Sequence, residues 1–426
     1  MSLFRRKPRP EVPTLGLYIH IPFCVRKCDY CDFYSVPGRG QRMDQYLKAL
    51  QCHLEESAPQ AESYQVDTIY LGGGTPSYFG AQRLAEVLRT IQKLYQVSRS
   101  CEITVECNPD SVDPEFLAQL KKAGVNRLSM GVQSAQDGEL REIGRIHSYQ
   151  QATQAFQQAR QAGFDNLSLD LIYGLPDQTM ESWQASVEAV LQLAPEHLSC
   201  YGLKLEEGTP LYERRQQEHM ADDDTQADMY LWMVERLAQA GYGQYEISNF
   251  ARPGFESRHN LKYWQGKEYM GFGPSAHSYF GARRYSFVRD LDVYVKGVLY
   301  NGKIIDSSSL VNRRERGKEY LMLRMRTIWG VEESEYRRAF YLNFTPLEER
   351  FREYRDYGWA ECTDGRWHFT PSGFLLSNPL IGDLLAIQEE TALETLRPIL
   401  LKRMEAERRQ QGEKQSKPRK NGHKNS

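Results

Sequence analysis

The chain has 426 residues, 40% of them hydrophobic and 12% aromatic, which is enough to bury the cores of two domains. Its formal charge of -2 at pH 7 gives no indication of a nucleic-acid partner, and no apolar run of about 18 residues could span a bilayer. Eight cysteines are too few for a secreted disulfide scaffold. Because the basic start MSLFRRKPRP leads into no apolar segment, we expect a protein of the cytoplasm.

Strand-like and helix-like segments alternate over the first part of the chain. The strand-like segments lie at 17–21, 66–71, 101–107, 126–132, 164–172 and 197–203. Apolar residues at helical spacing follow them, first near 42–57, 81–95 and 114–122. These β/α units predict an α/β fold with a parallel sheet and outer helices, either an open doubly wound sheet or a complete or partial barrel. In all of these folds, ligands bind at the carboxyl ends of the strands.

The character of the sequence changes after about residue 300. Amphipathic helices are predicted within 313–331 and 345–359, followed by a hairpin around Asp364 and Gly365 and a short helix. We therefore divide the chain into a basic arm (1–14), a core barrel (15–300), a small α+β domain of winged-helix type (301–400) and a tail (401–426). The tail is basic and polar, so we expect it to be disordered, with a weak attraction to an anionic membrane surface as its one foreseeable contact.

Three cysteines, Cys24, Cys28 and Cys31, gather in IHIPFCVRKCDYCDFYS, directly after the first predicted strand. A disulfide would leave one thiol unpaired, and structural zinc would need a fourth ligand, for which His20 lies in the wrong place within the strand. An iron–sulfur cluster fits better, because thiolates suit iron and three protein ligands leave one iron of a cubane open. The other cysteines are expected to be small buried residues: Cys52, Cys101, Cys107, Cys200 and Cys362.

Polar groups and glycines follow several of the predicted strands. Gly72–Gly74 would let a ligand approach the backbone, where free amides and carbonyls could pair with an ammonium group. Glu106 and Gln133 offer acceptors and donors for hydroxyl groups, and Arg145 offers a fork for a carboxylate. Asp170 lies within an otherwise apolar strand, where an unpaired charge would be costly. Each of these residues taken alone is more often an ordinary salt bridge, turn or strand-end hydrogen bond.

The spacing CxxxCxxC, with Tyr30 before the last cysteine, closely resembles the signature of the radical S-adenosylmethionine (SAM) superfamily. The resemblance implies a partial (β/α) barrel and a [4Fe–4S] cluster on Cys24, Cys28 and Cys31. In that superfamily the open iron holds the methionine end of SAM, and one-electron reduction cleaves SAM to a 5′-deoxyadenosyl radical.

From Tyr18 to about residue 278, the chain resembles the HemN-like branch, which contains oxygen-independent coproporphyrinogen III dehydrogenases and HemW-type heme chaperones. The resemblance implies that two tyrosines, Tyr18 and Tyr30, adjoin the cluster and cofactor. It also implies a set of SAM contacts: Gly73, Gly74, Thr75, Glu106, Gln133, Arg145 and Asp170. In the dehydrogenase some of these residues serve a second SAM molecule, so the number bound here stays open.

Three features favour the chaperone side of this branch. Phe33 stands where the dehydrogenase has a further cysteine, and fewer residues precede the cluster motif than in the dehydrogenase. The segment RHNLKYWQG also resembles the HNxxYW motif associated with heme handling, with its residues at His259, Asn260, Tyr263 and Trp264. A neutral imidazole can ligate heme iron, and aromatic faces can cover a macrocycle. His259 could equally be a hydrogen-bonded structural support.

The resemblance therefore implies a heme chaperone that carries a [4Fe–4S] cluster and SAM and transfers heme to acceptor hemoproteins, of respiratory type among others. The alternative is an enzyme, a coproporphyrinogen III dehydrogenase that acts on propionate side chains. A cluster-binding scaffold without heme is a third reading. No nucleic-acid partner is expected, and the oligomeric state is open.

Overall fold

A computed structural model describes residues 12–37 and 40–393. The predicted tail (401–426) and most of the predicted basic arm (1–14) lie outside these residues. The chain forms two compact units, the first ending at Asn312 and the second beginning at Arg313. Within the described ranges, no helix combines the length and apolar character needed to cross a membrane.

The first unit is built on a large mixed sheet, whose strand order is β14-β13-β12-β11-β1-β4-β5-β6-β7-β8-β10-β9. Its strands are β1 (Thr14–Ile21), β4 (Gln65–Gly73), β5 (Val97–Cys107), β6 (Arg127–Gln133), β7 (Leu167–Tyr173), β8 (His197–Gly202), β9 (Gly243–Gln244), β10 (Asn249–Ala251), β11 (Tyr269–Phe272), β12 (His277–Phe280), β13 (Arg283–Phe287) and β14 (Ile305–Leu310). The six predicted strands are the parallel series β1, β4, β5, β6, β7 and β8. The predicted α/β fold is thus confirmed.

Both edges of the sheet carry strands that the β/α rhythm did not predict. At one edge β11 pairs parallel with β1, and β12 to β14 continue from it as antiparallel strands. At the other edge β10 pairs antiparallel with β8. These strands are short, and several lack the length at which alternation becomes visible in a sequence. Because β14 pairs with β13, the first unit continues past the predicted boundary near residue 300.

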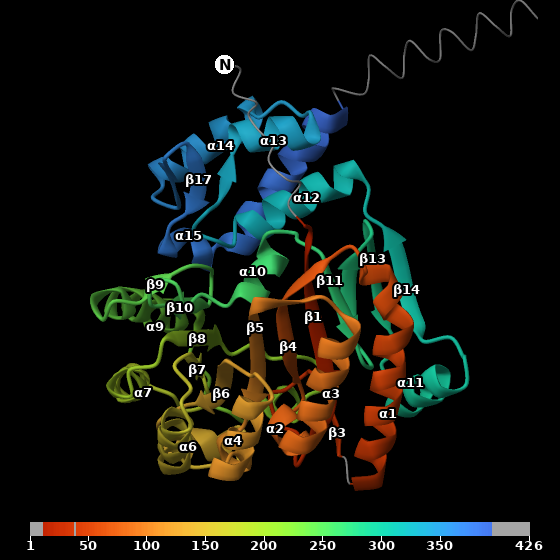
Figure 1. The fold of residues 1–426 in the computed structure, drawn as a ribbon. Helices are drawn as coiled ribbons and strands as arrows, with labels where there is room; N and C mark the ends of the chain where they lie inside the picture. Colours follow the sequence, from red (N-terminus) through yellow and green to blue (C-terminus); the bar gives the residue numbers. More distant parts are fainter. Residues whose placement is uncertain (1–11, 38–39, 394–426) are drawn as a thin grey trace, which may run out of the picture. The chain divides into compact units, whose positions relative to one another are not determined.

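Helices of the first unit alternate with the strands along the chain and cover the outside of the sheet (Figure 1). They are α1 (Gly40–Ser57), α2 (Pro76–Phe79), α3 (Ala81–Leu94), α4 (Pro114–Lys122), α5 (Asp137–Glu142), α6 (Tyr149–Gln161), α7 (Met180–Gln192), α8 (Pro210–Arg214), α9 (Asp223–Gln239), α10 (Arg258–Trp264) and α11 (Leu291–Leu299). In α3, Leu84, Val87, Leu88 and Ile91 are all fully buried, as the helical period requires of a face packed on a sheet. Side-chain caps begin α4, α6 and α7.

Alternation along the parallel strands decides what faces the interior. In β1, Leu15, Leu17 and Ile19 are fully buried and alternate with Gly16 and Tyr18. Successive side chains of a strand point to opposite faces, so one face of the curved sheet packs on the helices and the other presents small and polar groups. The polar face is the one from which the candidate site is built.

The second unit holds a small three-stranded sheet with the order β15-β17-β16. Its elements are α12 (Arg313–Arg324), β15 (Val331–Glu332), α13 (Glu333–Phe340), α14 (Thr345–Asp356), β16 (Ala360–Thr363), β17 (Arg366–Phe369) and α15 (Pro371–Leu375), followed by helical residues 377–393. The hairpin turns at Asp364 and Gly365, which both have positive φ, as the predicted two-residue turn requires. Helix α13 and strand β15 were not predicted.

Candidate cofactor-binding site

A cavity of about 480 Å³ opens at the carboxyl ends of the parallel strands. Twelve of the predicted site residues line it: Cys24, Cys28, Tyr30, Cys31, Gly73, Gly74, Thr75, Glu106, Gln133, Arg145, Asp170 and Asn260. Four other predicted residues are not part of its lining: Tyr18, His259, Tyr263 and Trp264. The cysteine motif and the polar strand ends therefore share one cavity.

The three thiols lie at one wall of this cavity, free of disulfides and partly exposed. Thr75 donates a hydrogen bond to the Cys24 sulfur at 3.3 Å, and Arg145 donates to the Cys28 sulfur at 3.4 Å. Burial raises the pKa of Cys24 and raises the pKa of Cys31 to about 11. Three soft ligands with nearby donors fit an iron–sulfur cluster, whose binding would deprotonate them. Within the described ranges, no three His, Cys, Asp or Glu side chains are grouped to hold a single metal ion.

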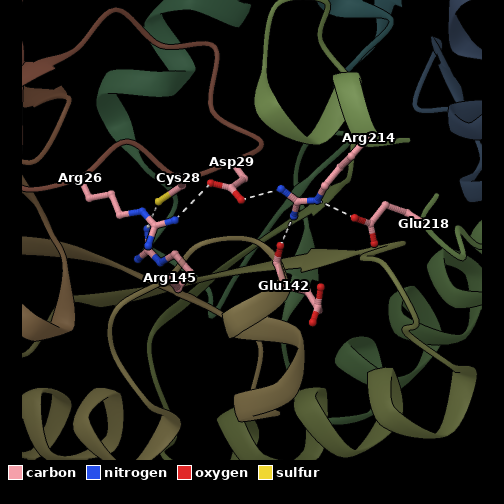
Figure 2. A network of polar contacts seen from close by, with 7 residues as sticks. All are labelled: Arg26, Cys28, Asp29, Glu142, Arg145, Arg214 and Glu218. Atoms are coloured by element: carbon pink, nitrogen blue, oxygen red, sulfur yellow. Dashed lines mark hydrogen bonds and ion pairs between the residues drawn. The ribbon is translucent and has the colours of Figure 1, made fainter. Parts of the chain in front are cut away.

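The loop that carries Cys28 is fastened through its neighbour Asp29 (Figure 2). The Asp29 amide donates to the Ile143 carbonyl at 3.1 Å, and its own carbonyl accepts from the Leu211 amide at 2.9 Å. Its carboxylate accepts a hydrogen bond from Arg214 at 2.6 Å. Arg214 reaches from α8 and also donates to the Glu142 carbonyl, so one guanidinium ties the cysteine loop to the end of α5. This contact could not be predicted from the sequence, because its partners are far apart in the chain.

The glycine segment at the end of β4 approaches the backbone of the cysteine loop closely. The Gly74 amide donates to the Ile21 carbonyl at 2.8 Å, and the Thr75 amide donates to the Phe23 carbonyl at 2.7 Å. A Cβ atom on Gly74 would lie 2.8 Å from the Phe23 carbonyl oxygen. The expectation that these amides are free for a ligand is therefore wrong. They join two strand ends, and close packing requires the glycine.

Glu106 accepts hydrogen bonds within the cavity from two directions. The Tyr70 hydroxyl donates to it at 2.8 Å, and the Gly73 amide donates at 3.0 Å. Burial raises the pKa of Glu106 to about 7, although both hydrogen bonds oppose the rise. The carboxylate is thus held in place with its charge near the point of titration at neutral pH.

Asp170 lies on β7, two strands from the strand that carries Glu106, among serine hydroxyls. Ser129 donates to its carboxylate at 3.1 Å and Ser168 donates at 3.4 Å. Burial raises the pKa of Asp170, while hydrogen bonds from Ser199 and the other serines lower it. The cost of an unpaired charge in an apolar strand is therefore reduced by donors on the neighbouring strands.

Arg145 is already bonded within the protein. Besides the Cys28 sulfur, its guanidinium donates to the Asn108 side chain at 3.0 Å and to the Gly131 carbonyl at 2.5 Å. The expected open fork for a carboxylate is therefore largely occupied. Arg145 places positive charge beside the thiols instead.

The cavity is also lined by polar residues that were not predicted from the sequence: Tyr70, Asn108, Arg127, Ser129, Ser199, Tyr201 and Lys204. A signal for some of them exists in β6, where Arg127, Ser129, Gly131 and Gln133 occupy every second position and all line the cavity. Three of the cysteines expected to be buried are so, whereas Cys52 is half-buried. Cys362 is exposed, because it lies in the exposed part of strand β16.

Comparison with known proteins decides the family. Residues 18–190 match the Radical SAM superfamily. The chain is 35% identical over 372 residues to the heme chaperone HemW of Bacillus subtilis (strain 168), covering 86% of this chain and 98% of that protein. It is 34% identical over 383 residues to the heme chaperone HemW of Escherichia coli (strain K12), covering 88% and 99%. The chain belongs to the HemW family of radical SAM proteins.

The HemW-family chain also shares its fold with a solved enzyme. The coproporphyrinogen III oxidase HemN from Escherichia coli, described as a radical SAM enzyme, superposes with a TM-score of 0.76 and 24% sequence identity. The match covers 89% of this chain and 90% of the enzyme. At this identity the likeness supports the fold and leaves activity open.

The HNxxYW segment of this HemW-family chain forms helix α10, capped by Ser257. The His259 side chain is fully buried, and both ring nitrogens are bonded, one to the Thr68 hydroxyl at 2.9 Å and the other to the Tyr263 hydroxyl at 2.8 Å. Burial lowers the pKa of His259 to about 3, so the ring is neutral. Tyr18 lies in the same cluster, with its ring 6.5 Å from that of His259. Of the four motif residues, Asn260 lines the cavity.

Proposed function

We propose that this chain is a heme chaperone, which carries a [4Fe–4S] cluster and SAM, binds heme and transfers it to acceptor hemoproteins. The observation that carries the proposal is the shared cavity, which collects three thiols with the polar strand ends expected to hold SAM. Relatives named as heme chaperones, which match this chain over most of their length, support heme as the cargo.

Cys24, Cys28 and Cys31 would hold the cluster. Their chemistry fits, because three thiolates leave one iron of a cubane without a protein ligand. When bound, such a cluster supplies an open coordination site for SAM and one electron at a time. Thr75 and Arg145, which donate hydrogen bonds to the Cys24 and Cys28 sulfurs, would raise the reduction potential of the cluster.

SAM would lie between the thiols and the polar strand ends. Glu106 is suited to accept hydrogen bonds from ribose hydroxyls, because Tyr70 and Gly73 fix its position. Asp170 and Gln133 would contact the remaining polar edges of the molecule, as both line the same cavity. Tyr30 packs against Ile143, Ile172 and Leu175, which keeps that wall apolar.

His259 is assigned a supporting role in this proposal. Ligation of heme iron by His259 would require the loss of both ring hydrogen bonds and the exposure of a buried imidazole. We infer that His259 instead fixes α10 against β4. Asn260 then lines the cavity, and the half-buried Trp264 keeps part of its side chain exposed.

The experiment is heme transfer. The anaerobically reconstituted chain is loaded with heme, mixed with an apo-cytochrome, and followed by the Soret band of each protein after separation. Under the proposal, heme moves to the acceptor and the cluster-free chain transfers it less well. In parallel, the chain is given dithionite, SAM and coproporphyrinogen III. Formation of protoporphyrinogen IX without heme transfer would favour the alternative, a dehydrogenase. Phe33 argues against that alternative, because it stands where the dehydrogenase has a cysteine, and its side chain is 70% exposed.

A further inference from the structure

Arg127 is a buried arginine whose Nε atom has no hydrogen-bond partner among the residues that the structure describes. It begins β6, lines the cofactor cavity, and its side chain is 2% exposed. Nε is the atom of the guanidinium nearest the aliphatic stem, and it is buried without an acceptor in the described part of the chain. A buried guanidinium that is left unpaired is costly, so such a group calls for a physical explanation.

The strand register brings Arg127 beneath two carboxylates. Strand β6 lies between β5 and β7, and Arg127 is opposite Thr104, two residues before Glu106. On the other side, Asp170 is opposite Gly131. Residues two apart in a strand face the same side, and two residues rise by about 7 Å. Arg127 therefore lies on the same interior face as Glu106 and Asp170, and all three line the cavity.

The tyrosines and cysteines around the two acids are neutral. Tyr70 of β4 acts on Glu106, and Glu106 acts in turn on Tyr18 of β1, Tyr263 of α10 and Cys107 of β5. Those near Asp170 include Tyr30 of the cysteine loop, Tyr201 and Cys200 of β8. Burial raises the pKa of all these hydroxyls and thiols, so they carry no charge at neutral pH.

Histidines next to Arg127 contribute no positive charge either. Burial lowers the pKa of His197 well below its usual value and that of His259 to about 3. The Arg145 guanidinium donates hydrogen bonds to Cys28, Asn108 and Gly131. Arg127 lowers the pKa of Glu106 and of Asp170, in each case against the effect of burial. Its charge therefore acts on both acids.

We propose that Arg127 is a positioning residue whose charge favours the ionised forms of both Glu106 and Asp170, so that both can accept hydrogen bonds from SAM. The inference rests on the proposed function in taking SAM as the ligand. An ionised carboxylate accepts hydrogen bonds on both oxygens, whereas a protonated one becomes a donor and would face the ribose hydroxyls less favourably. Arg127 itself need not touch SAM.

Infrared spectroscopy of the ligand-free chain tests the charge directly. Near pH 8, neither Glu106 nor Asp170 is expected to give a protonated-carboxyl band in the wild-type chain. A band would be assigned to one of these acids if Glu106→Gln or Asp170→Asn removed it. Arg127→Met should gain such a band, whereas Arg127→Lys, which keeps the charge, and the remote control Arg236→Met should not. A wild-type band that disappears in either acid variant overturns the proposal even if Arg127→Met fails to fold. A folded Arg127→Met without the band overturns it as well.

Equilibrium dialysis with SAM, on the unreduced reconstituted chain, supplies the functional readout. Arg127→Met should bind SAM roughly three- to tenfold more weakly than wild type near pH 7, with the ratio approaching one near pH 9 as the acids ionise again. A ratio that stays constant with pH would indicate a purely structural role and overturn the proposal. If the wild-type chain binds no SAM while the infrared band appears as expected, the proposed function fails and the role of Arg127 stands.

Discussion

Asp29 and Arg214 are joined by an ion pair of 2.6 Å between residues that are far apart in the chain. The same guanidinium donates to the Glu142 carbonyl and pairs with Glu218 (Figure 2). The cysteine loop is thereby fixed from outside the cavity, at Asp29, the residue next to Cys28. The position of the thiols depends on this contact as well as on the strand that precedes them.

Replacement of Arg214 by Met is expected to loosen the cluster loop without unfolding the chain. We predict that the reconstituted variant loses iron to a chelator about tenfold faster than wild type, because groups that orient metal ligands contribute on that scale. The measurement is the rate of iron release under anaerobic conditions. Arg236→Met is the matched control, since Arg236 forms a comparable ion pair with Glu188 on the outer helices. Equal release rates in the two variants would contradict the role given to Arg214.

SAM binding is expected to weaken as the pH falls through about 7. The pKa of Glu106 is raised from 4.5 to about 7, so the ionised acceptor is present above that pH and is lost below it. We predict a fall in affinity of up to about tenfold per pH unit below this point, measured by equilibrium dialysis. Glu106→Gln should bind weakly at every pH and lack this step. A step of unchanged size in Glu106→Gln would show that another group is responsible.

His259→Gln is expected to destabilise the first unit and to leave heme binding in place. Thr68 and Tyr263 would lose a buried partner, which we expect to lower the free energy of unfolding by about 1–3 kcal/mol. The folded pKa of about 3 lies below the ordinary value of 6.5. Wild type therefore loses stability as the pH falls from about 6.5 toward 3, and the variant should lose less.

Denaturant unfolding at several pH values, with the exposed His219→Gln as control, measures this effect. A heme titration followed by the Soret band completes the comparison. Loss of the Soret band in a folded His259→Gln chain, with its stability unchanged, would identify His259 as an iron ligand instead.

Gly16→Ala tests the packing of α10 on the sheet. An added Cβ atom would lie 2.9 Å from Lys262 Cδ and 3.0 Å from the Thr68 hydroxyl oxygen, and Lys262 is held by its ion pair with Asp67 at 2.7 Å. We expect a loss of about 1–3 kcal/mol in the free energy of unfolding. Gly138→Ala is the control, because nothing lies within 4 Å of its Cβ position and it lies within a helix. Equal unfolding midpoints for the two variants would rule out the tight contact.

The parallel strands and much of the cavity wall could be predicted from the sequence, because strands and helices follow fixed periods of apolar residues. Glu106 could be selected since it lies at the carboxyl end of a strand-like run, and Asp170 since it interrupts an otherwise apolar one. Asp29 and Arg214 could not, because nothing local distinguishes them from surface charges. His259 illustrates a third case, in which a motif located the residue correctly while its burial and its two hydrogen bonds depend on tertiary packing.

Electron paramagnetic resonance of the reduced, anaerobically reconstituted chain tests the central claim most directly. We predict about four iron and four sulfide per chain, a signal of a reduced [4Fe–4S] cluster, and a change in that signal when SAM is added. Cys31→Ser should lose the signal, and the exposed Cys362→Ser should keep it. Zinc bound in place of iron, or a cluster signal that SAM leaves unchanged, would contradict the account.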